Sequence, residues 1–151
     1  MLGGRKMKEL TIAVVGATGA VGQEILKVMA ERKIPYKELR LLASARSAGT
    51  QVEYQGKTYT VQETTENSFD DVDLALFAGG PASRAFGRLA QSKGCVVIDN
   101  SSTFRLEPDV PLVVPEVNPE ALKDHKGCSP TRTAPPFCWY RRCIHYTKKA
   151  K

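Results

Sequence analysis

Apolar runs and helical repeats alternate along the first part of the chain. Residues 10–17 (LTIAVVGA) form an unbroken apolar run, which is typical of a strand buried on both faces of a parallel sheet. From Ala20 to about Lys33 the apolar side chains recur at helical spacing, and Pro35 indicates where that helix ends. The pattern therefore predicts a strand that runs directly into a helix.

The same alternation continues through the middle of the chain. A β-hairpin is predicted over residues 52–61, where VEYQGKTYTV alternates around Gln55 and Gly56. Strands that alternate with helices favour a Rossmann-like α/β fold, a doubly wound parallel sheet that we expect to be incomplete. The remaining predicted elements are strands at 39–43, 73–78, 95–99 and 112–114, and a helix at about 83–92.

Composition limits the class of protein. The 151 residues are 42% hydrophobic and 25% charged, as in a globular domain. No apolar run approaches membrane-spanning length, so no membrane contact is expected. The opening MLGGRKMKEL lacks the apolar core and cleavage site of a secretory signal, which predicts a cytoplasmic protein.

The net charge of +6 is confined to the end of the chain. Residues 128–151 contain six Lys and Arg and no acid, whereas residues 1–127 contain sixteen residues of each sign. Residues 128–151 also show little apolar periodicity. This combination predicts a basic tail that is disordered or irregular.

The four cysteines divide in the same way. Cys95 lies in the apolar run KGCVVIDN and is interpreted as a small buried hydrophobic residue. Cys128, Cys138 and Cys143 lie near His145, but their spacing matches no zinc motif. No metal site is therefore predicted.

A glycine-rich loop follows the first predicted strand. It reads Gly16-Ala-Thr-Gly19-Ala-Val-Gly22, and the predicted helix begins inside it. At such a loop the backbone N–H groups and the positive end of the helix dipole face an anion, and glycine leaves room for a pyrophosphate. The placement after a buried strand favours dinucleotide binding over a tight turn that binds nothing.

The end of the second predicted strand indicates which dinucleotide is bound. An NAD site usually has an Asp or Glu here for the ribose 2′-hydroxyl. This chain has Ser44, Arg46 and Ser47 instead, which supply hydroxyl donors and a cation suited to the 2′-phosphate of NADP. We therefore predict NADP as the cofactor.

A third polar cluster, DNSSTFR, follows the strand predicted at 95–99 and ends at Arg105. The guanidinium of Arg105 is suited to a substrate phosphate or carboxylate. An ion pair with Glu107 or Asp109 explains this arginine equally well.

These motifs together resemble a known family. The segments VVGATGAVGQEIL, LRLLASARSAG, VDLALFAGG, VVIDNSSTFR and VPLVVPEVNPE resemble the N-terminal part of bacterial aspartate-β-semialdehyde dehydrogenase over about residues 8–127. The resemblance implies an oxidoreductase that makes aspartate semialdehyde from aspartyl phosphate with NADPH, on the route to lysine, threonine and methionine. N-acetyl-glutamyl-phosphate reductase shares the glycine loop and the type of reaction, but it is less similar at ASARSAG and VPEVNPE.

The resemblance also implies which residues bind ligands. The substrate phosphate is assigned to Arg105, and the family enzyme is a homo-oligomer, an assembly not expected for this chain. For NADP the resemblance implies contacts at the residues matching Thr18–Val21, Arg46 and Ser47. Together with the motifs, the residues assigned to the NADP site are Gly16, Thr18, Gly19, Ala20, Val21, Gly22, Ser44, Arg46, Ser47 and Gly79.

The chain departs from the family after Gly127. There the family has its catalytic cysteine in an Asn-Pro-Asn-Cys-Ser-Thr motif, and here the motif is absent, so no catalytic residue is assigned. A shifted reading frame builds each new codon from the last base of one residue's codon and the first two bases of the next residue's codon. In this frame, the codons that can encode residues 128–137 can also encode Leu-Ala-Asn-Pro-Asn-Cys-Ser-Thr-Ile. We interpret residues 128–151 as the product of a reading-frame change, through a sequencing error, a pseudogene or a real mutation.

The predicted domains are an extension at 1–7, an NADP-binding domain at 8–127 and an aberrant tail at 128–151. This makes the chain a fragment without dehydrogenase activity. The alternative is a non-catalytic NADP-binding module whose basic tail binds a partner or nucleic acid, with Trp139 and Tyr140 stacking beside Arg141 and Arg142. Nucleic acid is the less favoured partner, because a frame change already explains the composition of the tail.

Overall fold

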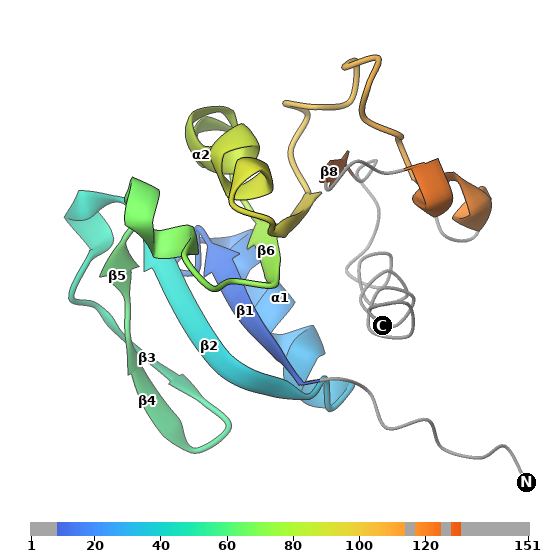
Figure 1. Cartoon of the computed structure of the whole chain (residues 1–151). Helices are drawn as coiled ribbons and strands as arrows, with labels where there is room; N and C mark the ends of the chain where they lie inside the picture. The colour runs from blue at the N-terminus through green and yellow to red at the C-terminus, as the bar shows by residue number, and fades with distance from the viewer. Residues whose placement is uncertain (1–8, 114–116, 125–127, 131–151) are drawn as a thin grey trace, which may run out of the picture.

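A parallel β-sheet organises the part of the chain that the computed structural model describes, residues 9–113, 117–124 and 128–130 (Figure 1). Its six strands lie in the order β5-β2-β1-β6-β7-β8. This order corresponds to 3-2-1-4-5-6, the doubly wound arrangement of dinucleotide-binding folds. The strands are β1 (Leu10–Val15), β2 (Tyr36–Ala43), β5 (Gln62–Glu63), β6 (Leu74–Phe77), β7 (Val96–Asp99) and β8 (Cys128–Pro130).

Strand β1 lies at the centre of the sheet, as its apolar run predicts. All of its residues are buried, and it pairs in parallel with β2 on one side and β6 on the other. Strands β6 and β7 are likewise buried along their whole length. Continuous apolar runs form these strands because both faces of the sheet are covered.

The two α-helices of the described residues cover opposite faces of the sheet. Helix α1 (Ala20–Glu31) buries Ile25, Leu26 and Met29 against one face, in a cluster with Ile12 of β1. Helix α2 (Gly80–Ser92) packs on the other face together with the 3-10 helix η2 (Glu66–Phe69). The predicted doubly wound α/β fold is confirmed, and the sheet has six strands.

The predicted hairpin forms a separate two-stranded sheet. Its strands are β3 (Gln51–Tyr54) and β4 (Lys57–Thr60), which pair antiparallel. Gln55 and Gly56 form the turn with φ of 50° and 74°, which is the geometry of a type I′ turn. In Figure 1 this hairpin extends away from the central sheet below β5.

Four segments differ from the sequence prediction, and one of them is β2, which begins at Tyr36, three residues before its predicted start. Leu112 and Val113, predicted as part of a strand at 112–114, lie in irregular backbone, where Val113 is completely buried and Leu112 is partly buried. Strand β5 was not predicted, because Gln62 and Glu63 are both exposed and carry no apolar pattern. Helix α2 begins at Gly80, three residues before the predicted start.

The beginning of the predicted irregular tail also differs. Residues 128–130 form β8, which extends the sheet by pairing Val97 with Cys128 and Asp99 with Pro130. Residues 131–151, which include Cys138, Cys143 and His145, lie outside the described residues. The predicted tail is therefore neither confirmed nor contradicted beyond Pro130.

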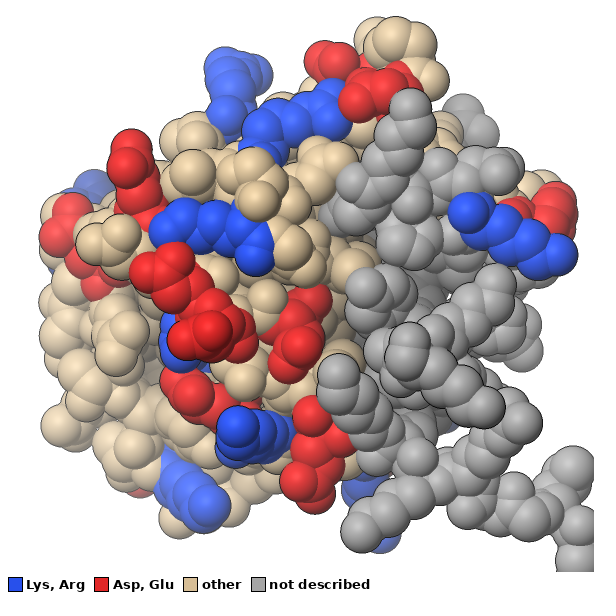
Figure 2. All heavy atoms as spheres, in the orientation of Figure 1, with Lys and Arg blue, Asp and Glu red and all other residues tan. Residues whose placement is uncertain are grey.

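Charges on the described surface are mixed. Figure 2 shows basic and acidic side chains interspersed on the face in view, in agreement with the equal numbers of each sign in residues 1–127. Within the described residues, no helix is long and apolar enough to cross a membrane.

Candidate functional site

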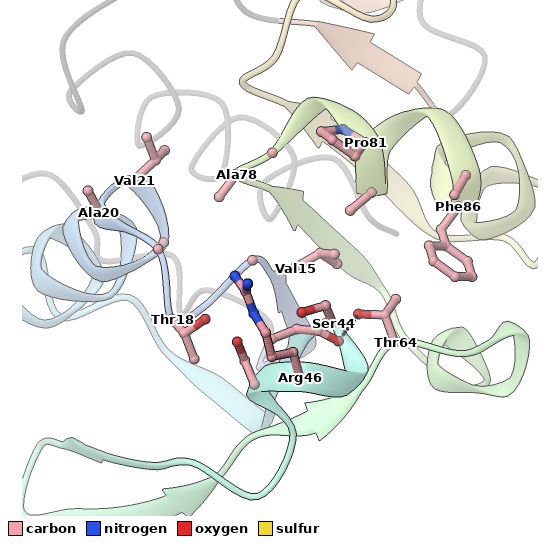
Figure 3. Close-up of a pocket in the computed structure, with 18 residues that line it drawn as sticks. Val15, Thr18, Ala20, Val21, Ser44, Arg46, Thr64, Ala78, Pro81 and Phe86 are labelled. Atoms are coloured by element: carbon pink, nitrogen blue, oxygen red, sulfur yellow. Dashed lines mark hydrogen bonds between the residues drawn. The ribbon is translucent and has the colours of Figure 1, made fainter.

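A cleft of about 590 Å³ opens at the carboxyl ends of β1, β2 and β6 (Figure 3). In the strand order this is the point where the chain direction across the sheet reverses, between β1 and β6. Ligands of open α/β sheets bind at this point. The residues that line the cleft are Val15, Gly16, Thr18, Gly19, Ala20, Val21, Gly22, Ala43, Ser44, Arg46, Ser47, Thr64, Ala78, Gly79, Pro81, Ala82, Ala85 and Phe86.

All ten residues that the sequence assigned to the cofactor line this cleft. They come from three segments that are far apart in the chain: the glycine loop, the segment after β2 and the segment after β6. The structure thus brings together every part of the predicted cofactor site.

Two glycines of the loop are required by the fold itself. Gly16 has a φ of 85°, and its N–H donates to the Leu42 carbonyl at 2.8 Å, which fixes the loop to the end of β2. A Cβ at Gly22 would lie 2.1 Å from the Gly16 carbonyl oxygen. Gly22 therefore allows α1 to pack directly on the loop that precedes it.

Gly19 and Gly79 are not required by the fold. They are the N-cap residues of α1 and α2, and neither helix has a side-chain hydrogen bond capping this end. A Cβ at Gly79 would meet nothing within 4 Å, and one at Gly19 would make only an ordinary contact of 3.5 Å with Gly16. Both uncapped helix ends thus border open space in the cleft, which fits an anionic pyrophosphate.

Polar side chains gather after β2. Ser44 precedes the 3-10 helix η1 (Ala45–Ser47), and Figure 3 shows the Arg46 side chain extending from η1 across the cleft towards Thr18. Among the described residues that line the cleft, none is an Asp or Glu. The electrostatic character of this end of the cleft therefore suits an anion.

Sequence reasoning missed Thr64 and Phe86. Thr64 fixes the segment after β2, because its backbone N–H and its hydroxyl donate to the Ala43 carbonyl at 2.8 and 3.0 Å. It belongs to no motif, and only the tertiary fold places it in the cleft. Phe86 follows the apolar pattern of α2 and is indistinguishable in sequence from a core residue.

Arg105 does not line the cleft. It lies in the loop after β7, where its backbone N–H donates to the Ser102 carbonyl at 3.3 Å. The two acids considered as its partners both contact Arg88: Asp109 through two bonds of 2.9 Å, and Glu107 at 3.6 Å. The assignment of Arg105 to a substrate phosphate stays a prediction.

A buried carboxylate connects that loop to the start of α2. Asp99 is completely buried at the end of β7, where it accepts bonds from the Ser83 hydroxyl at 2.6 Å and the Ser101 hydroxyl at 2.7 Å. Ser101 also donates its backbone N–H to Asp99 at 3.0 Å. Charge-assisted bonds of this kind fix the first turn of α2 where it borders the cleft.

Cys95 is buried with 1% of its surface exposed, as predicted. Desolvation by burial raises the pKa of its thiol to about 11, so the thiol stays protonated at neutral pH. Cys95 thus lacks the properties of a nucleophile. Within the described residues, no group of three or more His, Cys, Asp or Glu side chains is arranged to hold a metal ion.

Comparison with known proteins agrees with this geometry. A family model described as "Semialdehyde dehydrogenase, NAD binding domain" matches residues 11–125. The chain is 52% identical over 121 residues to aspartate-semialdehyde dehydrogenase from Prochlorococcus marinus, an alignment that covers 80% of this chain and 35% of that relative.

Solved structures of aspartate-semialdehyde dehydrogenases are also similar to this chain. Aspartate semialdehyde dehydrogenase II from Vibrio cholerae, complexed with ASA, superposes with a TM-score of 0.78 at 45% identity, over 82% of this chain and 42% of the other. The enzyme from Candida albicans, with NADP, gives a TM-score of 0.61 at 26% identity, over 77% and 36% of the two chains.

The chain spans about a third of the length of the curated relatives it matches. The match leaves out most of each relative. Because the family model covers more than half of this chain, the chain belongs to the semialdehyde dehydrogenase family, of which it carries the NAD binding domain.

Proposed function

We propose that this chain binds NADP in the cleft and is the nucleotide-binding part of an aspartate-semialdehyde dehydrogenase. The observation that carries the proposal is the convergence of the glycine loop, the segment after β2 and the start of α2 on one cleft at the reversal of strand order. The similarity to aspartate-semialdehyde dehydrogenases supports the choice of enzyme within the family.

The binding roles follow from the chemistry of each segment. The backbone N–H groups at the start of α1 donate to the pyrophosphate, and Gly79 lets it approach the start of α2. Ser44, Arg46 and Ser47 bind the ribose 2′-phosphate, and the missing carboxylate removes a repulsion that this phosphate would meet in an NAD site. Bound NADPH supplies a hydride to the reaction.

For the whole protein we propose the reduction of aspartyl phosphate to aspartate semialdehyde, with Arg105 holding the substrate phosphate. The residues described in the cleft supply binding groups and no nucleophile. The nucleophile of this reaction is expected in the Asn-Pro-Asn-Cys-Ser-Thr motif, which the shifted reading of residues 128–137 permits. We therefore also propose a reading-frame change near Gly127.

Sequencing the coding DNA across the codons of residues 126–151 tests the frame change. The expected result is one added or missing base, with the cysteine motif in the corrected frame. A frame that stands as written would exclude a sequencing error only, whereas DNA whose shifted frame does not encode the cysteine motif would contradict the frame change and leave the proposal for the cleft intact.

Titrating the chain with NADP and with NAD, by calorimetry, tests the cofactor. NADP is expected to bind at least about tenfold more tightly, because bonds to a charged phosphate contribute about 1.5–3 kcal/mol. Arg46→Ala is expected to weaken NADP binding about ten- to a hundredfold and to change NAD binding little. Arg84→Ala removes the same charge from an exposed position of α2 outside the cleft, and it serves as the matched control.

Equal affinity for the two dinucleotides, or an equal loss of NADP affinity in both arginine variants, would contradict the choice of NADP. Binding of neither dinucleotide would overturn the proposed function itself.

A further inference from the structure

The wall of the cleft formed by α2 is apolar and carries one aromatic ring. Among the described residues that line the cleft, Phe86 is the only aromatic side chain. Ala82 and Ala85 precede it on the same wall, and their short side chains leave the space beside the ring open. Flat apolar walls of this kind suit a planar ligand group.

The ring of Phe86 is supported from behind. Its centroid lies 6.1 Å from that of Phe69 in η2, and the ring of Phe69 in turn stacks on Phe77 at 5.9 Å with an interplanar angle of 15°. Phe69 and Phe77 are completely buried, whereas Phe86 is only partly buried. The two core rings thus restrict Phe86 before any ligand arrives, which lowers the entropy cost of a stacking contact.

Phe86 lies on the same side of the cleft as Ser44, one of the residues proposed to bind the 2′-phosphate. Helix η2, which carries Phe69, begins two residues after Thr64, and Thr64 is bonded to Ala43 directly before Ser44. Figure 3 shows the ring of Phe86 directed from α2 towards the side where Thr64 and Ser44 lie. In NADP the base and the 2′-phosphate are attached to neighbouring carbons of one ribose, so a phosphate held by Ser44 brings the base to this side of the cleft.

We propose that Phe86, resting on Phe69, is the platform on which the adenine base of the dinucleotide stacks. This proposal rests on the proposed binding of NADP and adds a residue that recognises the base. In this proposal different parts of NADP bind at different places in the cleft. The pyrophosphate binds at the glycine loop, and the adenosine with its 2′-phosphate binds near η1 and Phe86.

The test measures how tightly two probes, each corresponding to one half of the dinucleotide, bind to the parent chain and to two variants of Phe86. The probes are 2′,5′-ADP, which contains the base and the 2′-phosphate, and nicotinamide mononucleotide, which contains neither. Phe86→Leu keeps an apolar side chain and removes the ring, and it is expected to weaken 2′,5′-ADP about tenfold. Phe86→Tyr keeps the ring and is expected to bind 2′,5′-ADP within about twofold of the parent chain.

Nicotinamide mononucleotide is expected to bind the parent chain and both variants alike. Leu89→Ala is the matched control, since Leu89 is a partly buried residue of α2 that packs on the same core without lining the cleft. This control is expected to leave the affinity for 2′,5′-ADP unchanged.

Phe86→Trp provides a direct readout that does not depend on the leucine variant being stable. Stacking of the base on the new indole is expected to quench its fluorescence on addition of 2′,5′-ADP, after subtraction of the parent signal from Trp139. Unchanged 2′,5′-ADP affinity in Phe86→Leu, or an unquenched indole in a chain that binds 2′,5′-ADP, would overturn the role of Phe86. A parent chain that binds no NADP would instead overturn the proposed function.

Discussion

Two glycines three residues apart in one loop serve different purposes. Gly22 is needed for packing, because its Cβ would lie 2.1 Å from the Gly16 carbonyl oxygen, a backbone atom that cannot move alone. Gly19 has φ of −80° and only one ordinary contact at its Cβ position, so the folded chain accepts a methyl group there. The fold therefore does not require glycine at position 19, whereas the proposed approach of a pyrophosphate does.

Substituting each glycine with alanine separates these purposes. Gly22→Ala is expected to destabilise the chain by about 3 kcal/mol and to lower Tm by about 6–12 °C, because the loop and helix must move apart. Gly19→Ala is expected to keep Tm within about 2 °C and to weaken NADP binding about tenfold or more, since the methyl group occupies the approach of the pyrophosphate. Thermal unfolding and calorimetric titration measure the two effects. Similar Tm values for the two variants would contradict the packing role of Gly22.

The thiol of Cys95 provides a test of burial through pH. Its pKa of about 11 lies above the ordinary thiol value of about 8.5. The unfolded chain therefore loses this proton first, and stability falls as pH rises from about 8.5 to 11. This single group is expected to lower the free energy of unfolding by about 2–3 kcal/mol across that interval.

Urea unfolding of the parent chain and of Cys95→Ala at several pH values isolates the contribution of Cys95. The alanine variant is less stable at neutral pH because of the cavity it creates, but its stability is expected to fall less steeply above about pH 8.5. Parallel pH curves for the two chains would show that the thiol is not desolvated in the folded state.

At the scale of elements, helix α2 is held at its first turn by a buried charge. Asp99 is completely buried and accepts the Ser83 hydroxyl at 2.6 Å. Ser92, at the last turn of the same helix, donates its hydroxyl to the Leu89 carbonyl at 2.7 Å but is exposed. The two serines thus make similar bonds in environments that differ in burial and in the charge of the acceptor.

Ser83→Ala is expected to destabilise the chain by about 1–3 kcal/mol, since a buried carboxylate oxygen loses a donor. Ser92→Ala is expected to change stability by less than about 0.5 kcal/mol, because water replaces the lost bond at an exposed site. Chemical denaturation of both variants measures the difference. An equal effect of the two substitutions would mean that the Asp99 carboxylate does not fix the first turn of α2.

Sequence reasoning predicted best those elements whose local pattern of apolar residues matches their burial in the folded chain. Strands β1, β6 and β7 are buried on both faces, so an unbroken apolar run is both their local signal and the consequence of the fold. Strand β5 consists of two exposed polar residues that pair only because β2 lies beside them, and this information is not local. Val113 shows the opposite case, because it is buried without being in a strand.

The same distinction applies to the cleft. The glycine loop was predictable because its function depends on backbone geometry, which glycine spacing encodes directly. Arg46 was predictable because it follows the end of β2, where the fold class fixes the position of the ribose. Phe86 was not predictable, since whether a helix residue faces a core or a cleft depends on where the neighbouring strands end.

At the scale of the whole molecule, the residues of the proposed NADP site all lie within the part of the chain that the family model matches. The family match ends at residue 125, and the chain spans about a third of the length of its relatives. All residues of the proposed NADP site precede residue 87, and the printed sequence contains no Asn-Pro-Asn-Cys segment. The 151-residue chain is therefore expected to bind NADP and to show no NADP-dependent oxidation of aspartate semialdehyde in the presence of phosphate.

We expect a shifted frame after Gly127 to place the catalytic cysteine of the family close to the end of strand β8. Strand β8 runs parallel to β7, with Asp99 paired to Pro130, so β8 ends at the same edge of the sheet where the cleft opens. The shifted reading puts its cysteine within a few residues of this point. A protein made from the frame-corrected gene is expected to form NADPH from NADP, aspartate semialdehyde and phosphate, and substituting the restored cysteine with serine is expected to abolish that absorbance change. Turnover by the 151-residue chain itself would contradict this account. A frame-corrected protein that folds and binds NADP but shows no turnover would also contradict it.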